Sequence, residues 1–189
     1  SGEKKNILEF SCRHFYEEGK TNLILCKGKT TANKTASEIY NWIDHDIKND
    51  EVNLIQRYID EEMGCTSLFS KLLGRGIAVH HAGLSDEVKL LTEHLIRKGL
   101  VNYVCATTTI AEGVNFPVSS VYFDTYQRGK NNILSANDFW NIAGRAGRTM
   151  VDDFGKIILP FNSEKNIETG IEILRKGAEE LTSVLSKLF

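Results

Sequence analysis

The chain has 189 residues, of which 41% are hydrophobic and 25% are charged, and its formal net charge is −2. Its length and apolar content suit one α/β domain with a proper core and a short appendage. The balance of charges excludes binding to nucleic acid through overall basicity, so such binding would need a local basic patch. No apolar run approaches the roughly 18 residues of a membrane span, and no signal peptide is visible.

The cysteines and the first residues indicate where the chain comes from. Cys12, Cys26, Cys65 and Cys105 show no CxxC spacing, and two of them end apolar runs. This is typical of buried thiols in a reducing cytosol, so we expect a cytoplasmic protein. Because the chain starts at Ser1-Gly2 without an initiator Met, we also expect it to be a piece of a longer protein.

In the first half of the chain, helical and strand patterns alternate. Apolar residues recur at helical spacing before Gly19, and NLILC predicts a short buried strand. Gly64 divides two helical patterns between Asp50 and Leu73, and Ser85 suits the N-cap of a later helix. In chain order, we expect a helix over 5–18, a strand over 22–26, a helix over 35–47, helices over 52–63 and 67–73, a strand over 76–82 and a helix over 85–98.

The second half begins with strands and ends in a long helix. Apolar runs predict strands over 100–107, 118–123 and 155–159. Ser135, with Asp138 three residues later, forms a capping box at the start of another helix. A last amphipathic helix over 163–188 has these apolar residues at helical spacing: Ile167, Ile171, Leu174, Leu181 and Leu185.

Short apolar strands that alternate with helices predict an α/β fold, with a mainly parallel sheet flanked by helices on both faces. Ligands of such folds gather at the carboxyl ends of the strands. Polar clusters follow the expected strands here, so we expect their loops to line one edge of the sheet. They lie at 27–30, 80–83, 107–109 and 144–148.

The cluster Lys27-Gly28-Lys29-Thr30 raises the question of a phosphate-binding P-loop. The pattern G-x-x-x-x-G-K-[ST] requires a glycine at position 23, which is Leu23. A strand followed by a polar turn and a helix accounts better for these residues. The chain also has no D-E-x-[DH] box to hold Mg²⁺, so we expect it neither to bind ATP tightly nor to hydrolyse it alone.

The stretch His80-His81-Ala82-Gly83-Leu84 has two interpretations. It is either a plain strand-to-helix connection or a loop whose N–H groups meet a phosphate near Gly83 and the helix that follows. Adjacent histidines on a strand face opposite sides and cannot share one metal ion. We therefore expect no metal site.

Two further stretches carry candidate chemistry. In NIAGRAGR, Arg145 and Arg148 are either arginine fingers, whose guanidinium groups fork onto phosphate oxygens, or surface charges around a turn. In ATTTIAEGVNFP, the threonines offer hydroxyl and N–H groups to phosphates, Gly113 permits a tight backbone and Asn115 could bond a ribose. Alternatively, this stretch is a threonine-rich cap of a short helix.

The order and separation of these stretches resemble the C-terminal RecA-like lobe, or helicase C domain, of superfamily 2 DExH helicases. The Superkiller-type branch is the most similar, because it typically carries a helical insert before HHAGL. In this chain the insert would lie at about residues 44–75. The resemblance runs from about Thr21 to Leu159. It implies the second motor lobe of an ATP-dependent nucleic-acid helicase, with ATP and Mg²⁺ held mainly by an absent N-terminal lobe of the same polypeptide.

The resemblance also implies roles for individual residues. The catalytic residues would be Arg145 and Arg148, which reach the γ-phosphate. ATP would also meet Asn141, Gly144, Gly113 and Asn115, although Asn141 stands where the family usually has Gln. The backbone of single-stranded or partly duplex DNA or RNA would meet Thr107, Thr108, His81, Gly83, Lys27 and Lys29.

On this basis the chain divides into three parts. Residues 1–20 would be a helix or linker from the first lobe, 21–162 the RecA-like domain, and 163–189 a helix or linker to a following domain. The alternative is a non-catalytic RecA-like module that only binds nucleic acid or docks to protein. A Walker A motif and a D-E-x-[DH] box upstream in the parent protein would distinguish the motor from this module.

Overall fold

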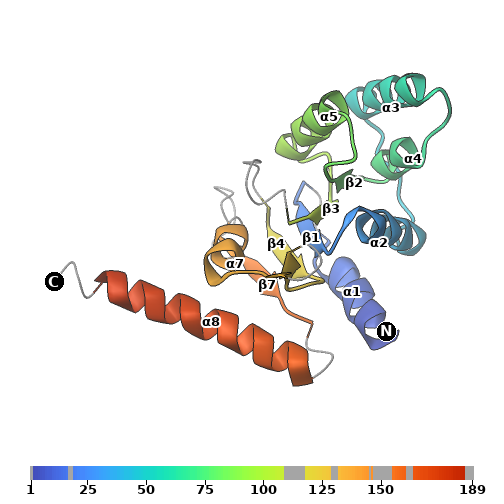
Figure 1. Ribbon diagram of the computed structural model, residues 1–189. Coiled ribbons are helices and arrows are strands. Elements are labelled where there is room, and N and C mark those ends of the chain that lie inside the picture. Colours follow the sequence, from blue (N-terminus) through green and yellow to red (C-terminus); the bar gives the residue numbers. More distant parts are fainter. Residues whose placement is uncertain are drawn as a thin grey trace.

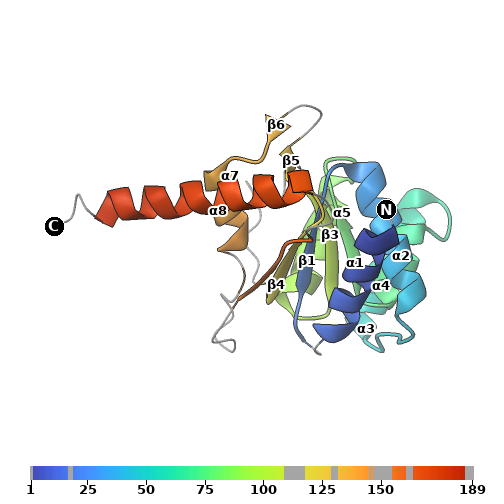
Figure 2. The same cartoon turned by 90° about the horizontal axis from the view of Figure 1, so that it is seen from below.

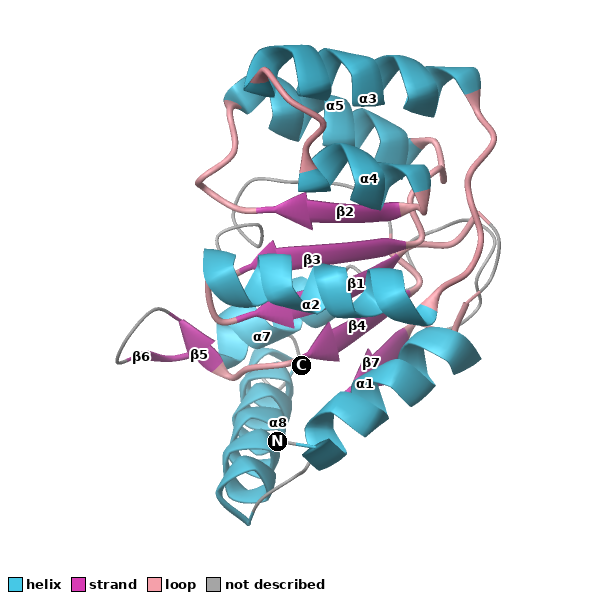
Figure 3. Ribbon diagram, turned by 90° about the vertical axis from the view of Figure 1, so that its right-hand side faces the viewer, coloured by secondary structure: helices cyan, strands magenta, loops and turns pink. Residues whose placement is uncertain are grey.

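A parallel β-sheet forms the centre of the protein. The computed structural model describes residues 2–16, 19–108, 118–128, 132–144, 146, 155–160 and 164–185. Its five-stranded sheet has the order β2-β3-β1-β4-β7, and all neighbouring strands run parallel (Figure 3). The strands are β1 (Asn22–Cys26), β2 (Ile77–His80), β3 (Tyr103–Thr107), β4 (Ser120–Phe123) and β7 (Lys156–Ile158). The predicted fold class is therefore confirmed.

Helices cover both faces of this sheet, and two apolar cores result (Figure 1). The helices are α1 (Gly2–His14), α2 (Lys29–Trp42), α3 (Asp50–Met63), α4 (Leu68–Gly74), α5 (Asp86–Arg97), α7 (Ala136–Ala143) and α8 (Glu164–Leu185). Alternation along β1 sends Leu23 and Leu25 into the core shared with α3, α5 and α7. Ile24 and Cys26 point into the opposite core, shared with α1 and α2.

The edge of the sheet at β2 is covered by α4. Leu72 of this helix belongs to one core and Leu73 to the other. Before it, Gly64 ends α3 in the left-handed conformation, with φ of 67°, as expected for a glycine that divides two helices. The predicted insert is therefore a packed pair, α3 and α4, beside the sheet.

Some boundaries differ from the prediction. Helix α2 begins at Lys29 and ends at Trp42, whereas the sequence predicted a polar turn and a helix over 35–47. It starts early because its first turns bury Ala32, Thr35 and Ala36 against the sheet, and this packing stabilises the helix before residue 35. Helix α1 ends at His14, four residues before the predicted end.

The last helix also differs from expectation in its buried face. Of the apolar residues predicted for this face, Ile167 and Ile171 of α8 are exposed, whereas Leu174 is partly buried against the core that Ile173 enters. Helix α8 packs against α7 and then extends past it, away from the sheet (Figure 2). A two-stranded antiparallel ribbon, β5 (Gln127–Arg128) with β6 (Asn132–Ile133), was not predicted, because two residues give no periodic signal.

Helix α1 packs on the sheet and closes one core. Leu8 and Cys12 are buried there, and the hydroxyl of Tyr103 on β3 donates a hydrogen bond to the carbonyl oxygen of Cys12 at 2.8 Å. Burial raises the pKa of the Cys12 thiol to about 12, so this cysteine stays protonated and inert at neutral pH. Within the segment expected to be a helix or linker, residues Gly2–His14 thus form a helix that packs on the sheet.

Candidate functional site

The carboxyl ends of the strands meet at one edge of the sheet. Cys26 at the end of β1 pairs in register with Thr107 at the end of β3, and His80 at the end of β2 pairs with Ala106. The next residues along the chain, Lys27, Thr108 and His81, therefore begin their loops side by side. The expected gathering of polar clusters at one edge holds for these described loops.

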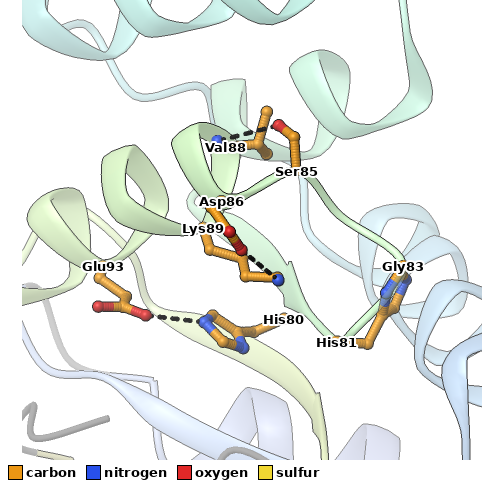
Figure 4. Close-up of polar contacts among 8 residues, drawn as sticks. All are labelled: His80, His81, Gly83, Ser85, Asp86, Val88, Lys89 and Glu93. Carbon is orange, nitrogen blue, oxygen red and sulfur yellow. Dashed lines mark hydrogen bonds and ion pairs between the residues drawn. The ribbon is translucent and has the colours of Figure 1, made fainter. Parts of the chain in front are cut away.

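His81 connects the loop after β2 to helix α2. Its side chain is buried, and Nε2 lies 3.0 Å from Oδ1 of Asn33. The N–H of Gly83 donates to Nδ1 of the same ring at 3.1 Å, which gives the loop its tight turn (Figure 4). Because Nδ1 accepts a hydrogen bond, the ring proton is on Nε2 and is donated to Asn33.

The environment of His81 keeps its ring neutral. Burial lowers the pKa of this histidine below its usual 6.5, and the nearby charges of His80, Lys29 and Lys89 act in the same direction. Both ring nitrogens are already used inside the protein. The neutral ring therefore shapes the loop through these two hydrogen bonds.

This burial predicts a pH dependence of stability. The folded-state pKa of His81 is lower than its unfolded value of 6.5, so the unfolded state takes up a proton first as pH falls. The stabilising contribution of the neutral His81 ring to the free energy of unfolding is complete above pH 6.5. It is lost as pH falls towards the pKa of the folded state. Urea denaturation at about pH 7.5 and about pH 5 should show a smaller acid loss for His81→Gln than for the wild type. The control is His14→Gln, at an exposed histidine, and equal losses in both variants would contradict this role.

His80 is held by a second polar contact that the sequence did not reveal. Its Nε2 lies 2.9 Å from Oε1 of Glu93 on α5, and Glu93 also approaches Arg97 at 3.8 Å (Figure 4). The two adjacent histidines thus point to different helices, one to α5 and the other to α2. Together they fix the end of β2 between these helices.

Helix α2 begins at the same edge with an uncapped N-terminus. Its N-cap is Gly28, which has no side chain to accept from the first N–H groups. Lys27, Lys29 and Thr30 are exposed around it. A methyl group at Gly83 would lie 3.6 Å from Cδ of Lys29, so the Lys29 side chain passes beside the loop after β2. Positive charge and free N–H groups therefore coincide where β1 and β2 end.

Thr107 and Thr108 occupy the end of β3, next to these loops. Both are largely buried, with exposed fractions of 9% and 7%, so access to their hydroxyl groups is limited on this side of the edge. The described part of this loop ends at Thr108, and Gly113 and Asn115 lie outside the described residues.

Helix α7 supports the arginine stretch. Ser135 caps it by accepting the N–H of Asp138 at 3.0 Å, as predicted, and Phe139 stacks on Phe123 of β4 with ring centroids 4.5 Å apart. Asn141 is exposed, and Gly144 ends the helix by donating to the carbonyl oxygen of Trp140 at 2.8 Å.

Beyond the helix, Ala146 forms a parallel bridge with Val118. It also lies against Gly155, where an added Cβ would come within 2.5 Å of its carbonyl group. Arg145 and Arg148 lie outside the described residues. Their neighbours Gly144 and Ala146 are nevertheless placed by α7, by Val118 and by Gly155, the residue before β7.

Two kinds of feature are missing from the residues that the structure describes. Over the ranges that the structure describes, no group of three or more His, Cys, Asp or Glu side chains is arranged to hold a metal ion. No helix in those ranges combines the length and the apolar character that crossing a membrane requires.

Comparison with known proteins places these features in a family. Residues 5–150 match the model of the helicase conserved C-terminal domain. The chain is 32% identical over 149 residues to Hachiman protein HamB of Bacillus cereus, which covers 78% of this chain and 13% of that protein. It is 42% identical over 106 residues to antiviral helicase SKI2 of Saccharomyces cerevisiae, which covers 54% of this chain and 8% of that protein.

A third relative matches nearly the whole chain. ATP-dependent DNA helicase Hel308 of Pyrococcus horikoshii is 29% identical over 189 residues, which covers 97% of this chain and 26% of that helicase. The chain thus spans about a quarter or less of the length of these relatives. The match over residues 5–150 and the parallel sheet with its loops at one edge lead to the same conclusion: the chain belongs to the helicase conserved C-terminal domain family, in the Superkiller-type branch of superfamily 2.

Proposed function

We propose that the chain is the second motor lobe of an ATP-dependent nucleic-acid helicase. The observation that carries the proposal is the edge of the sheet at which β1, β2 and β3 end together, within a family of helicase domains. Loops that meet at this edge can contact one strand at successive phosphates, and such backbone contacts are independent of base sequence. DNA and RNA are both compatible with this kind of contact.

The proposed grip on the strand comes from the described loops. Lys27, Lys29 and the uncapped start of α2 supply positive charge and N–H groups for one phosphate. The loop at Gly83 and the end of β3 at Thr107 and Thr108 lie beside it. His81 acts by holding this loop against Asn33, so its part in binding is to position the backbone.

The proposed nucleotide site lies at the other end of the domain sequence. Asn141 and Gly144 are exposed at the end of α7, and Gly113, Asn115, Arg145 and Arg148 are assigned to the same site by the resemblance. No P-loop is present in the sequence. ATP with Mg²⁺, which supplies the free energy of hydrolysis, would therefore be held mainly by another lobe of the parent protein. That lobe and this chain would together form the site.

The test is strand displacement and ATP hydrolysis by the full-length parent protein, with and without single-stranded nucleic acid. A motor should hydrolyse ATP faster when a strand is bound and should separate duplexes only with ATP. A parent that binds strands but shows neither activity would be the non-catalytic binding module, and the motor proposal would then be wrong.

The two exposed lysines should determine part of the salt dependence of binding. Replacing Lys27 and Lys29 by alanine in the full-length protein should weaken binding of a single-stranded oligonucleotide. It should also flatten the plot of log affinity against log salt by about 0.7 for each phosphate that the protein no longer neutralises. Lys98→Ala is the matched control, because this exposed lysine follows α5 at the opposite edge of the sheet and pairs with Glu51. An unchanged slope in the double variant would show that both lysines are merely solvated.

A further inference from the structure

A groove lies between helices α3 and α5, separate from the edge with the polar loops. Its volume is about 690 Å³. The two helices lie side by side at the opposite end of the domain from α8 (Figure 1). The groove is lined by Leu54, Ile55, Arg57, Tyr58, Glu61, Glu87, Leu90 and Leu91.

The walls of this groove are apolar and open to solvent. Leu54 is 66% exposed, Leu90 is 62% exposed and Tyr58 is 41% exposed. Leu54 and Tyr58 are four residues apart on α3, so they form one ridge, and Leu90 faces them from α5. Several large apolar side chains gathered in one open groove are typical of a surface that another protein covers.

The two helices are held firmly beneath this groove. Ile59 of α3 and Leu95 of α5 are fully buried in the same core. At the far end of the pair, the carboxylate of Glu51 contacts Nε2 of His94 at 2.6 Å and Nζ of Lys98 at 3.1 Å. The groove is therefore formed before anything binds, which lowers the entropic cost of binding.

Charge distinguishes one end of the groove from the other. Glu61 in the last turn of α3 and Glu87 in the first turn of α5 lie at the same end, and the last turn of α3 has no basic residue. In the described part of the chain, neither carboxylate takes part in a side-chain hydrogen bond or ion pair. An occupant with positive charge at this end would therefore find two unpaired partners.

Two other occupants fit this charge pattern poorly. Nucleic acid would place phosphates in a groove whose charged lining, Glu61, Glu87 and Arg57, is net negative and repels them. A second copy of the chain that docked groove to groove would offer its own acidic end or its far end. At the far end Glu51 already pairs with His94 and Lys98, so little free positive charge remains there.

We infer that this groove binds a short amphipathic helix of a partner protein, with Lys or Arg at the end that meets Glu61 and Glu87. A third helix laid between two neighbouring helices inserts apolar side chains at i, i+3, i+4 and i+7. Helix α3 has 14 residues, about 21 Å at 1.5 Å per residue, which matches an occupant of three to four turns. The inference stands apart from the helicase function, because it uses a surface that the proposed site does not.

A model peptide tests this docking surface on the full-length parent protein. The probe is a fluorescent helix of about 14 residues, which is three to four turns, with leucines at i, i+3, i+4 and i+7 and lysines at one end. Its counterpart carries glutamates in place of the lysines. Fluorescence anisotropy should show that the basic peptide binds at least about tenfold more tightly than the acidic one. The double variant Leu54→Ser/Leu90→Ser should weaken the basic peptide about tenfold or more. Phe10→Ser, at a residue that is 65% exposed on α1, should leave its affinity unchanged.

Labelling shows whether the groove is open in the parent protein. In a Cys65→Ser background, which removes an exposed thiol, Leu90→Cys should react with a water-soluble maleimide and be protected by the basic peptide. An unreactive Cys at this position would mean that another part of the parent covers the groove, which overturns the proposal. Equal affinity for both peptides, or binding that survives the double serine variant, would overturn it as well.

Discussion

Replacing Arg148 by alanine in the full-length parent protein is expected to lower its ATP hydrolysis by about 10³-fold or more, the scale of an arginine finger. In the proposed site, this guanidinium faces the γ-phosphate that the other lobe holds and stabilises charge in the transition state. Binding of single-stranded nucleic acid should survive, because the strand is assigned to the loops after β1, β2 and β3. The measurement is steady-state hydrolysis at saturating nucleic acid, beside strand binding by anisotropy.

Two controls separate this role from a general effect of charge. Arg148→Lys keeps the positive charge but loses the planar fork, so it should remain strongly impaired. Arg57→Ala removes an exposed arginine of α3 and should leave hydrolysis unchanged. Normal hydrolysis in Arg148→Ala would eliminate the finger assignment, whereas equal loss of hydrolysis and strand binding would indicate damage to the fold.

The sheet was the part of the fold that the sequence predicted best. Each central strand is a short buried segment built on apolar residues, such as Leu23–Cys26 in β1, and both faces of such a strand are covered by helices. The pattern therefore predicted each strand, but only β1 has the predicted bounds, and the other four strands are one to three residues shorter at an end than expected. The sequence also predicted two helix N-caps, Ser85 and Ser135. Each side chain accepts a hydrogen bond from the N–H three residues later.

Helix boundaries were predicted less well where tertiary packing overrides local preference. Lys29, Thr30 and Thr31 carry little helical signal, yet α2 includes them because the turn that follows must bury Ala32 and Ala36. In α8, an amphipathic pattern alone cannot select which apolar residue meets α7 and the core. The structure selects Ile173 over Ile167 and Ile171.

The candidate site shows a similar division. The loops could be placed at one edge from the strand pattern, since parallel strands end together. The contacts of the two histidines could not be predicted. His81 meets Asn33 across 48 residues of chain, and His80 meets Glu93 across 13. These pairs come together only because α2 and α5 pack against β2, so the spacing of the residues along the sequence does not reveal them.

A glycine seven residues after Arg148 should prove as sensitive to substitution as a site residue. Gly155→Ala would place a Cβ 2.5 Å from the carbonyl carbon and oxygen of Ala146, closer than any real contact of this kind. Because the obstacle is backbone, no side chain can rotate away, and the bridge between Val118 and Ala146 must shift. Overpacking of this kind costs about 1–3 kcal/mol of folding free energy. Urea denaturation should therefore show a clear loss of stability.

The same substitution should affect catalysis more than strand binding. Ala146 directly follows Arg145 and stands two residues before Arg148, so displacing it moves the segment to which both proposed fingers belong. ATP hydrolysis by the full-length variant should fall at least about tenfold, since misplacement of about 1 Å is enough for a large loss of rate. Gly28→Ser is the matched control for stability, because a Cβ there meets no atom within 4 Å and serine is a favourable N-cap residue for α2. If Gly155→Ala kept the stability and the hydrolysis rate of the wild type, Gly155 would not be what places Ala146, and the support proposed for the arginine segment would have to come from α7 alone.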